Sequence, residues 1–339
     1  MMLCKRIRRF VSRILIPTGY LVLVSLPLSV ALGSAHGGES SKPPIIGEVW
    51  FVDPATSQPW DSVFQDGLRD LGYVEGKNIT IIRRYANGDA AQLPALLKEL
   101  IALPVDVLLV GSKTVKAATA ATKTIPIVCP SMGDPVRDGL VASLQRPGGN
   151  LTGAYGLIVE MQSKLLELTT ELVPNLQRVD VIFDADDASD NTDAEEFRAL
   201  AHRVGVSVHT LGVRNLKDIR AALKTIERDR VQALIVFDDP LTDLHREPIM
   251  RHTQRRFPVI SDGRDWAKSG AVLTYAPNYY EMWRRGAVYV DKIIKGAKAG
   301  DLAIEQPTKF ELVVNLKTVK ALGITIPESI LVRADEVIR

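Results

Sequence analysis

The sequence of 339 residues contains only two cysteines, Cys4 and Cys129. Cys4 belongs to a basic and apolar N-terminal stretch that we expect to be removed, so Cys129 would remain alone and could form no internal disulfide. Cys129 ends a short apolar run, and the sequence offers no identifiable partner that would activate it. These features favour a buried, unreactive thiol over a nucleophile.

The short motifs of common catalytic and nucleotide-binding sites are also missing. No G-x-G-x-x-G follows a predicted strand, and neither a Walker P-loop pattern nor a G-x-S-x-G elbow occurs. The five histidines show no HExxH or other metal-ligand spacing. Neighbouring carboxylates such as Asp238 and Asp239 point apart on an extended turn, which disfavours acid–base pairing. We therefore expect a protein that is not an enzyme and that holds no metal and no cofactor.

Acidic residues are absent from the first 35 positions, which contain five basic side chains. Residues 14–32 are almost wholly apolar, and Gly33-Ser34-Ala35 supplies small residues for cleavage. This order predicts a secretory signal peptide over residues 1–35, cut after Ala35, and a periplasmic location. An uncleaved membrane anchor is the alternative, although two prolines and a glycine interrupt the short span.

The balance of charge argues against nucleic acid as a partner. The whole chain has a formal net charge of +2, but 37 basic and 40 acidic residues remain after residue 35. A mildly acidic chain lacks the basic surface that binding to a phosphate backbone requires.

Strands and helices alternate along the rest of the chain, with about five β-α units, a pause near Gly153–Val159, and about five more. Repeated β-α units predict doubly wound parallel sheets. We expect two α/β lobes, one formed by residues 45–154 with about 276–305 and the other by residues 155–275 with about 306–339. A ligand cleft would lie between them.

One run, Ile125–Gly153, is the most informative part of this pattern. It predicts a strand, a polar turn at Ser131–Pro135, a short helix capped by Asp138, a glycine turn and a second strand. Polar turns after strands lie at the edge of the sheet where open α/β proteins bind ligands.

The chain resembles the ABC-transporter substrate-binding protein family that includes tryptophan- and tyrosine-binding lipoproteins. The resemblance covers nearly all of the chain after the signal peptide. It rests on FQDGLRDLGYVEGKNI (Phe64–Ile79), GDPVRDGLVASLQRPGGNLTG (Gly133–Gly153), KLLELTTELVP (Lys164–Pro174), YVDKIIKGAKAGDLAIEQPTKFELVVNLKTVKALGITIP (Tyr289–Pro327) and RADEVI (Arg333–Ile338).

This resemblance implies a type I periplasmic-binding-protein fold, with two α/β lobes joined by three crossings. It also implies a secreted receptor that hands a small-molecule solute to an ABC permease in the inner membrane, and we expect it to be a monomer. Three cleft turns depart from the family's usual residues: Phe51–Trp60, Gly111–Thr114 and Asp184–Asp190. The resemblance therefore extends to the fold but not to the identity of the ligand.

The residues that follow predicted strands are the candidate ligand contacts. They are Asp53, Thr56, Ser112, Lys113, Thr114, Ser131, Asp134, Tyr155, Asp184, Asp239, Asp262, Arg264 and Tyr275. Ser112 and Thr114 open a helix, where free amides and the helix dipole favour a carboxylate, and Lys113 adds a positive charge. Simple helix capping is the alternative role for these two side chains.

In the second lobe, an aspartate would pair with a ligand ammonium group and Arg264 would bind a ligand carboxylate. Salt bridges between the lobes are the alternative role for these residues. Tyr155, Tyr275 and Trp60 could stack on an aromatic ligand, although a single aromatic residue more often only packs.

We therefore expect a periplasmic solute-binding protein of an ABC importer, with a carboxylate-bearing ligand such as an amino acid. A ligand with an amine or amide group is the next choice. Two other functions stay open: a ligand sensor that docks on a receptor kinase and, less favoured, a Rossmann-type enzyme.

Overall fold

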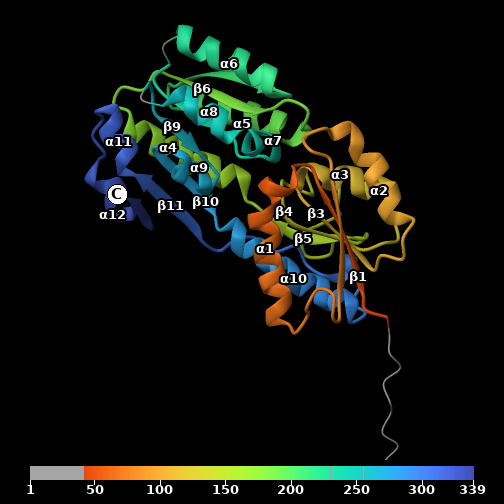
Figure 1. Cartoon of the computed structure of the whole chain (residues 1–339). Coiled ribbons are helices and arrows are strands. Elements are labelled where there is room, and N and C mark those ends of the chain that lie inside the picture. Colours follow the sequence, from red (N-terminus) through yellow and green to blue (C-terminus); the bar gives the residue numbers. More distant parts are fainter. Residues whose placement is uncertain (1–41, 230, 255) are drawn as a thin grey trace, which may run out of the picture. The chain divides into compact units, whose positions relative to one another are not determined.

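Short and almost fully buried strands form the centre of the structure, shown as a computed structural model in Figure 1. All four residues of β3 (Val107–Val110) are buried, as expected for a parallel strand covered on both faces. The structure describes residues 42–229, 231–254 and 256–339. The predicted signal peptide and its cut after Ala35 lie outside these residues.

Within the described residues, the strands form one five-stranded and one seven-stranded sheet. The first has the order β2-β1-β3-β4-β5, and all of its neighbouring strands are parallel. Its other strands are β1 (Ile45–Trp50), β2 (Thr80–Tyr85), β4 (Ile127–Met132) and β5 (Leu151–Tyr155).

The second sheet has the order β12-β11-β10-β9-β8-β6-β7 and is parallel except between β10 and β11. Its strands are β6 (Arg178–Asp184), β7 (Ser207–Val213), β8 (Leu234–Val236), β9 (Val259–Ser261), β10 (Leu273–Pro277), β11 (Phe310–Asn315) and β12 (Glu336–Ile338). The two doubly wound α/β sheets confirm the predicted fold class.

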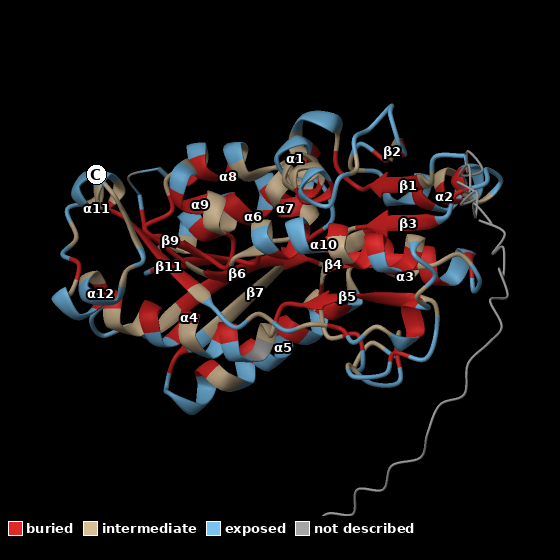
Figure 2. Cartoon of the chain, turned by 90° about the horizontal axis from the view of Figure 1, so that it is seen from below, coloured by how far each residue is buried: buried red, intermediate tan, exposed pale blue. Residues whose placement is uncertain are grey.

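Helices cover both faces of each sheet. On the first sheet, α1 packs against α10 on one face, and α2 packs against α3 on the other (Figure 1). On the second sheet, α4, α5 and α12 lie on one face, and α6, α8 and α9 lie on the other (Figure 2). The α-helices are α1 (Pro54–Asp70), α2 (Leu93–Ile101), α3 (Ser112–Ala121), α4 (Ile158–Leu172), α5 (Ala188–Arg203), α6 (Leu216–Asp229), α7 (Pro240–Leu244), α8 (Arg246–Thr253), α9 (Arg264–Ser269), α10 (Tyr279–Ile294), α11 (Leu316–Leu322) and α12 (Glu328–Arg333).

The chain crosses between the two sheets at three segments. These lie between β5 and α4, between β10 and α10, and between a short 3-10 turn (Ala299–Asp301) and β11. The first and third run side by side, because the Tyr155 amide donates to the Glu305 carbonyl at 2.9 Å and the Glu305 amide to Gly153 at 3.0 Å. The residue limits that the sequence predicts for the two lobes stay a prediction.

The helix predicted after Asp138 is wrong. Residues 135–139 form a turn and residues 140–150 contain no helix. Asp134 accepts hydrogen bonds from the amides of Val136 and Arg137, each at 3.0 Å. Gly139 then adopts a φ of +68°, which ends any helical continuation. Asp138 is therefore not a helix cap, and its carboxylate accepts a hydrogen bond from Ser189 instead.

The described part of the chain contains no helix that is both long and apolar enough to cross a membrane.

Gly153 is a point where the backbone requires glycine. Its φ is +143°, and a Cβ at this position would lie 1.8 Å from the carbonyl oxygen of Cys129 on the neighbouring strand. The close approach of β4 and β5 just before the first crossing therefore requires that residue 153 has no side chain.

We expect Gly153→Ala to lower the free energy of unfolding by about 3 kcal/mol or more, because backbone strain and a steric clash act together. Chemical denaturation measures this change. Gly149→Ala is the matched control, since a Cβ at that exposed glycine meets no atom within 4 Å. Equal stability of the two variants would contradict the expectation.

Candidate functional site

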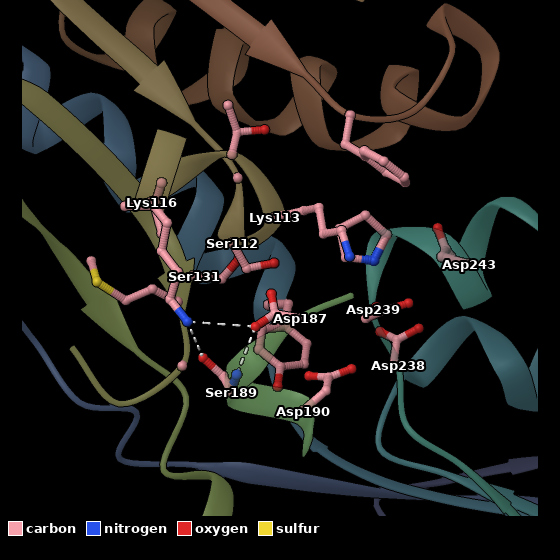
Figure 3. A pocket seen from close by; sticks show the side chains of 18 of the residues that line it. Ser112, Lys113, Lys116, Ser131, Asp187, Ser189, Asp190, Asp238, Asp239 and Asp243 are labelled. Carbon is pink, nitrogen blue, oxygen red and sulfur yellow. Dashed lines mark hydrogen bonds and ion pairs between the residues drawn. The ribbon is translucent and has the colours of Figure 1, made fainter. Parts of the chain in front are cut away.

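A cavity of about 160 Å³ lies where the carboxyl ends of the two sheets meet (Figure 3). The first sheet contributes the ends of β1, β3 and β4 and the start of α3. The second contributes the start of α5 and the segment after β8. Since one water molecule needs roughly 10–15 Å³ measured in this way, the cavity has room for a small organic molecule.

Five of the thirteen predicted residues line this cavity. They are Ser112, Lys113, Thr114, Ser131 and Asp239. They follow strands of both sheets. Ligands of open α/β proteins bind beyond the carboxyl ends of strands, which explains why these residues lie close together. Their contact with a ligand stays a prediction.

The other eight predicted residues lie outside the cavity lining. Asp53 caps α1 by accepting from the Thr56 amide, Asp134 caps a turn, and Asp262 accepts from the Asp238 amide. Asp184 pairs with Lys113, and Tyr155 is buried beside the first crossing.

The last two of these eight residues, Arg264 and Tyr275, contact residues near the second and third crossings. Arg264 pairs with Glu311 and Glu336, and Asn278 also donates to Glu311, at 3.0 Å. Tyr275 stacks on Phe310, with ring centroids 5.4 Å apart. Both partners of Arg264 lie in the second sheet, on which its own helix packs, so these ion pairs are not the salt bridge between lobes that was the alternative. Contact of Arg264 with a ligand stays a prediction, and its side chain lines a small neighbouring pocket.

An ion pair between Lys113 and Asp184 joins the two sheets beside the cavity. Lys113 lies in the first turn of α3 and Asp184 ends β6, and their side chains are 7% and 1% exposed. Burial alone would lower the pKa of Lys113, but the hydrogen bond and charge of Asp184 raise it. Lys113 also lies 5.6 Å from the ring centroid of Phe51. The lysine is therefore a fixed cation of the closed cleft.

Further polar contacts bridge the cleft. Lys116 donates to Ser189 at 3.1 Å and lies 3.3 Å from Asp138 and 3.7 Å from Asp187 (Figure 3). Arg137 donates to Asp193 at 2.6 Å. Lys116 comes from α3 and Arg137 from the turn after β4, whereas Asp187 and Asp193 lie at and near the start of α5. Charge complementarity therefore favours the approach of the two walls.

Three tryptophans form the apolar side of the cavity. Trp50 stacks on Trp283 with ring centroids 4.8 Å apart, and Trp60 lies 6.2 Å from Trp283. The Trp283 indole donates to Ser131 at 3.2 Å, and the Trp50 indole donates to Glu48 at 3.0 Å. Burial raises the pKa of Glu48 to about 8. Both hydrogen bonds fix the ring planes that face the cavity.

The start of α3 presents backbone donors to the cavity. Gly111 is the N-cap and makes no side-chain cap, while the amides of Thr114 and Val115 bond back to its carbonyl at 3.0 and 3.1 Å. Among the described residues, this leaves the amides of Ser112 and Lys113 as the unpaired donors of the first turn. A helix start with free amides suits a ligand carboxylate.

The opposite wall is acidic. Burial raises the pKa of Asp239 to about 8 and that of Asp193 to about 6, and it raises the pKa of Asp262, which lies outside the lining, to about 7. Burial, together with neighbouring carboxylates, also raises the pKa values of Asp190 and Asp238. Among the described residues, no group of three or more His, Cys, Asp or Glu side chains is arranged to hold a metal ion.

Sequence reasoning missed several residues of the site. Trp50 follows the same strand-end rule that found Ser112 and could have been included. Asp190 and Asp193 both belong to α5, which begins at Ala188, whereas the sequence analysis treats Asp184–Asp190 as a cleft turn and selects only Asp184 from it. Trp283 lies inside α10, and its place in the cavity depends on the second crossing, for which the sequence gives no local signal.

Comparisons with known proteins agree with this architecture. The profile of the family described as ABC transporter substrate binding protein matches residues 51–338. A protein of Clostridioides difficile named tyrosine-binding protein is 25% identical over 287 residues, which cover 84% of this chain and 82% of the relative.

Two solved structures are similar over 87% of this chain. A conserved domain protein from Vibrio cholerae has a TM-score of 0.81 and 26% identity, and all of its chain is covered. The ABC domain in complex with L-Trp from Streptococcus pneumoniae has a TM-score of 0.80 and 25% identity, with 99% of its chain covered.

We expect Lys113→Met to lower the free energy of unfolding by about 3 kcal/mol, because it leaves Asp184 buried without its cation. The double variant Lys113→Met, Asp184→Asn should regain much of this loss, since no uncompensated charge remains. Chemical denaturation of the two single variants and the double variant measures the coupling. Simple additivity of the two changes would contradict the role of this ion pair.

The ligand-free protein should lose stability as the pH rises from about 7 to 8.5. A buried carboxyl group with a raised pKa holds its proton in the folded state and not in the unfolded state, so folding takes up a proton, and this uptake costs more free energy as the pH rises until it passes the folded pKa. Asp239 and Glu48, whose pKa values are both raised to about 8, lose their protons from the folded state in this pH range. Burial lowers the pKa of His245, so this histidine changes the pH dependence of stability only below about pH 6.5. Melting temperatures of the wild type and Asp239→Asn across this range test this, and equal slopes would contradict it.

Proposed function

The chain belongs to the family of ABC transporter substrate-binding proteins, and on this basis we propose that it is the periplasmic receptor of an ABC importer. It binds a small amino-acid-like solute in the cavity between its sheets and delivers the solute to a membrane permease. The observation that carries this proposal is the cavity itself, which combines the first-turn amides of α3 on one wall, aspartates on the other and an aromatic side.

The two polar walls complement the two ends of an amino acid. The amides of Ser112 and Lys113 and the Ser112 hydroxyl suit a carboxylate at the start of α3. Asp239, on the other wall, suits an ammonium group. The tyrosine-binding relative and the L-Trp complex support a ligand of this class.

The arrangement of the chain also supports binding by closure. Three crossings join the sheets, and the ion pair of Lys113 with Asp184 and the hydrogen bond of Arg137 with Asp193 both span the cleft. A ligand placed between the walls would add contacts to both and stabilise this closed arrangement. The closed surface would then be the one that the permease recognises.

Isothermal titration calorimetry of residues 36–339 with the twenty amino acids tests the proposal. We expect one chemical class to bind, and Ser112→Ala to weaken that binding about tenfold through loss of a hydrogen bond to a charged group. Ser143→Ala, at an exposed serine outside the cavity lining, is the control and should bind as the wild type does. Binding of sugars with no binding of any amino acid would contradict the ligand class.

A further inference from the structure

The aromatic rings that line the cavity stack on one another. Trp50, at the end of β1, stacks on Trp283 of α10 with ring centroids 4.8 Å apart and an angle of 16° between the ring planes. Trp60 stacks on Tyr280, with centroids 4.5 Å apart and an angle of 20°. Each of the three indoles in the lining therefore already has the ring contact that an aromatic solute would otherwise supply.

Hydrogen bonds hold the stacked pair of Trp50 and Trp283 in place. The Trp50 indole donates to Glu48 at 3.0 Å, and the Trp283 indole donates to Ser131 at 3.2 Å. The two tryptophans are only 6% and 5% exposed. Neither ring can turn aside to admit a ligand ring without losing both its hydrogen bond and its stacking partner.

The Trp283 ring also lies against the segment that would bind a ligand carboxylate. A Cβ on Gly111, the N-cap of α3, would lie 3.9 Å from Cζ2 of Trp283. The same indole engages the hydroxyl of Ser131, one of the predicted ligand contacts. On this side of the cavity, the space beside a bound carboxylate is therefore taken by the Trp283 ring, so a bulky ligand ring could not extend there.

The space that the rings leave is small. The cavity measures about 160 Å³. An engineered protein cavity of about 150 Å³ holds one molecule of benzene. A volume of this size suits roughly six to nine non-hydrogen atoms, as in alanine, serine or threonine, whereas tryptophan has about fifteen.

The contacts between the walls keep the cavity at this size. Lys113 and Asp184 pair across the cleft with side chains 7% and 1% exposed, and Arg137 donates to Asp193 at 2.6 Å. A solute too large for the cavity would hold these partners apart and leave buried charges unpaired. Closure therefore discriminates against bulky solutes through the contacts that they would break.

We propose that Trp50 and Trp283 determine the size of the solute, restricting the cavity to small amino acids such as alanine, serine or threonine and excluding aromatic ones. This rests on the proposed function, because it narrows the class of amino acid bound in the same cavity. The two indoles act by filling space. Other groups of the cavity bind the charged ends of the solute, and the rings limit only the length of its side chain.

A series of amino acids of increasing size tests the inference on the wild-type protein. Glycine, alanine, serine, threonine, leucine, phenylalanine and tryptophan share both charged groups and differ only in the side chain. We expect calorimetry to show the tightest binding for alanine, serine or threonine. Binding of phenylalanine and of tryptophan should be weaker by about tenfold or more, because their rings do not fit the space that remains.

Trp283→Ala tests the assigned ring. It should strengthen tryptophan binding by about tenfold or more, and indole alone should raise its melting temperature by refilling the space of the missing ring, without effect on the wild type. If circular dichroism shows the alanine variant to be unfolded, Trp283→Leu, which keeps an apolar side chain, replaces it. Phe64→Leu is the matched control: it opens space at a fully buried ring of α1 outside the cavity lining and should gain no binding of tryptophan or indole.

The outcomes distinguish this inference from the proposed function. Tighter binding of phenylalanine or tryptophan than of alanine, serine and threonine by the wild type would overturn the size inference and leave an amino-acid receptor intact. An equal response of the wild type and the Trp283 variant to indole would overturn the assignment of this ring. Binding of sugars and of no amino acid would contradict the proposed function, whereas a gain of indole binding by the variant alone would still support the space-filling role of Trp283.

Discussion

The ion pair between Lys113 and Asp184 is the contact on which the arrangement of the site depends. Both side chains are almost fully buried, and each belongs to a different sheet. A charge in such a place is tolerated only beside its partner, so the pair ties the end of β6 to the start of α3. The cavity walls face each other at the distance that this pair sets, and the contacts of Lys116 with Ser189 and of Arg137 with Asp193 reinforce the same approach.

The two walls differ in the kind of polar group that they present. The first sheet offers backbone amides, which have a fixed position and a partial charge, and tryptophans held by hydrogen bonds to Ser131 and Glu48. The second offers carboxylates whose protonation responds to pH and to any bound cation. In the proposed function, the first wall would orient the solute and the second would select it by charge.

Much of the fold could be predicted from the sequence, because its signals are local. The two strands predicted within and at the end of the run Ile125–Gly153 are present as β4 and β5. The predicted helix after Asp138 failed since Asp134 and Gly139 together form turns, and the short strand Glu336–Ile338 has too little periodicity to be recognised. The antiparallel pairing of β11 with β10 depends on the third crossing and leaves no mark on either strand.

The site was predictable only in part, for a related reason. Rules about strand ends found Ser112, Lys113, Ser131 and Asp239, which line the cavity. They could not tell that Arg264 would be engaged by Glu311 and Glu336, because those partners lie 47 and 72 residues further along the chain. Nor could they place Trp283, which reaches the cavity only after the chain has crossed back to the first sheet.

The positions of the tryptophans also determine how the protein's fluorescence would respond to binding. Of the four tryptophans in the sequence, three line the cavity and the fourth, Trp266, is fully buried. Entry of a solute would replace water beside the three indoles, whereas the surroundings of Trp266 would change little. The intrinsic tryptophan fluorescence of the protein would therefore report binding without any attached dye. Its emission wavelength and intensity would change with the fraction of the protein that has bound solute.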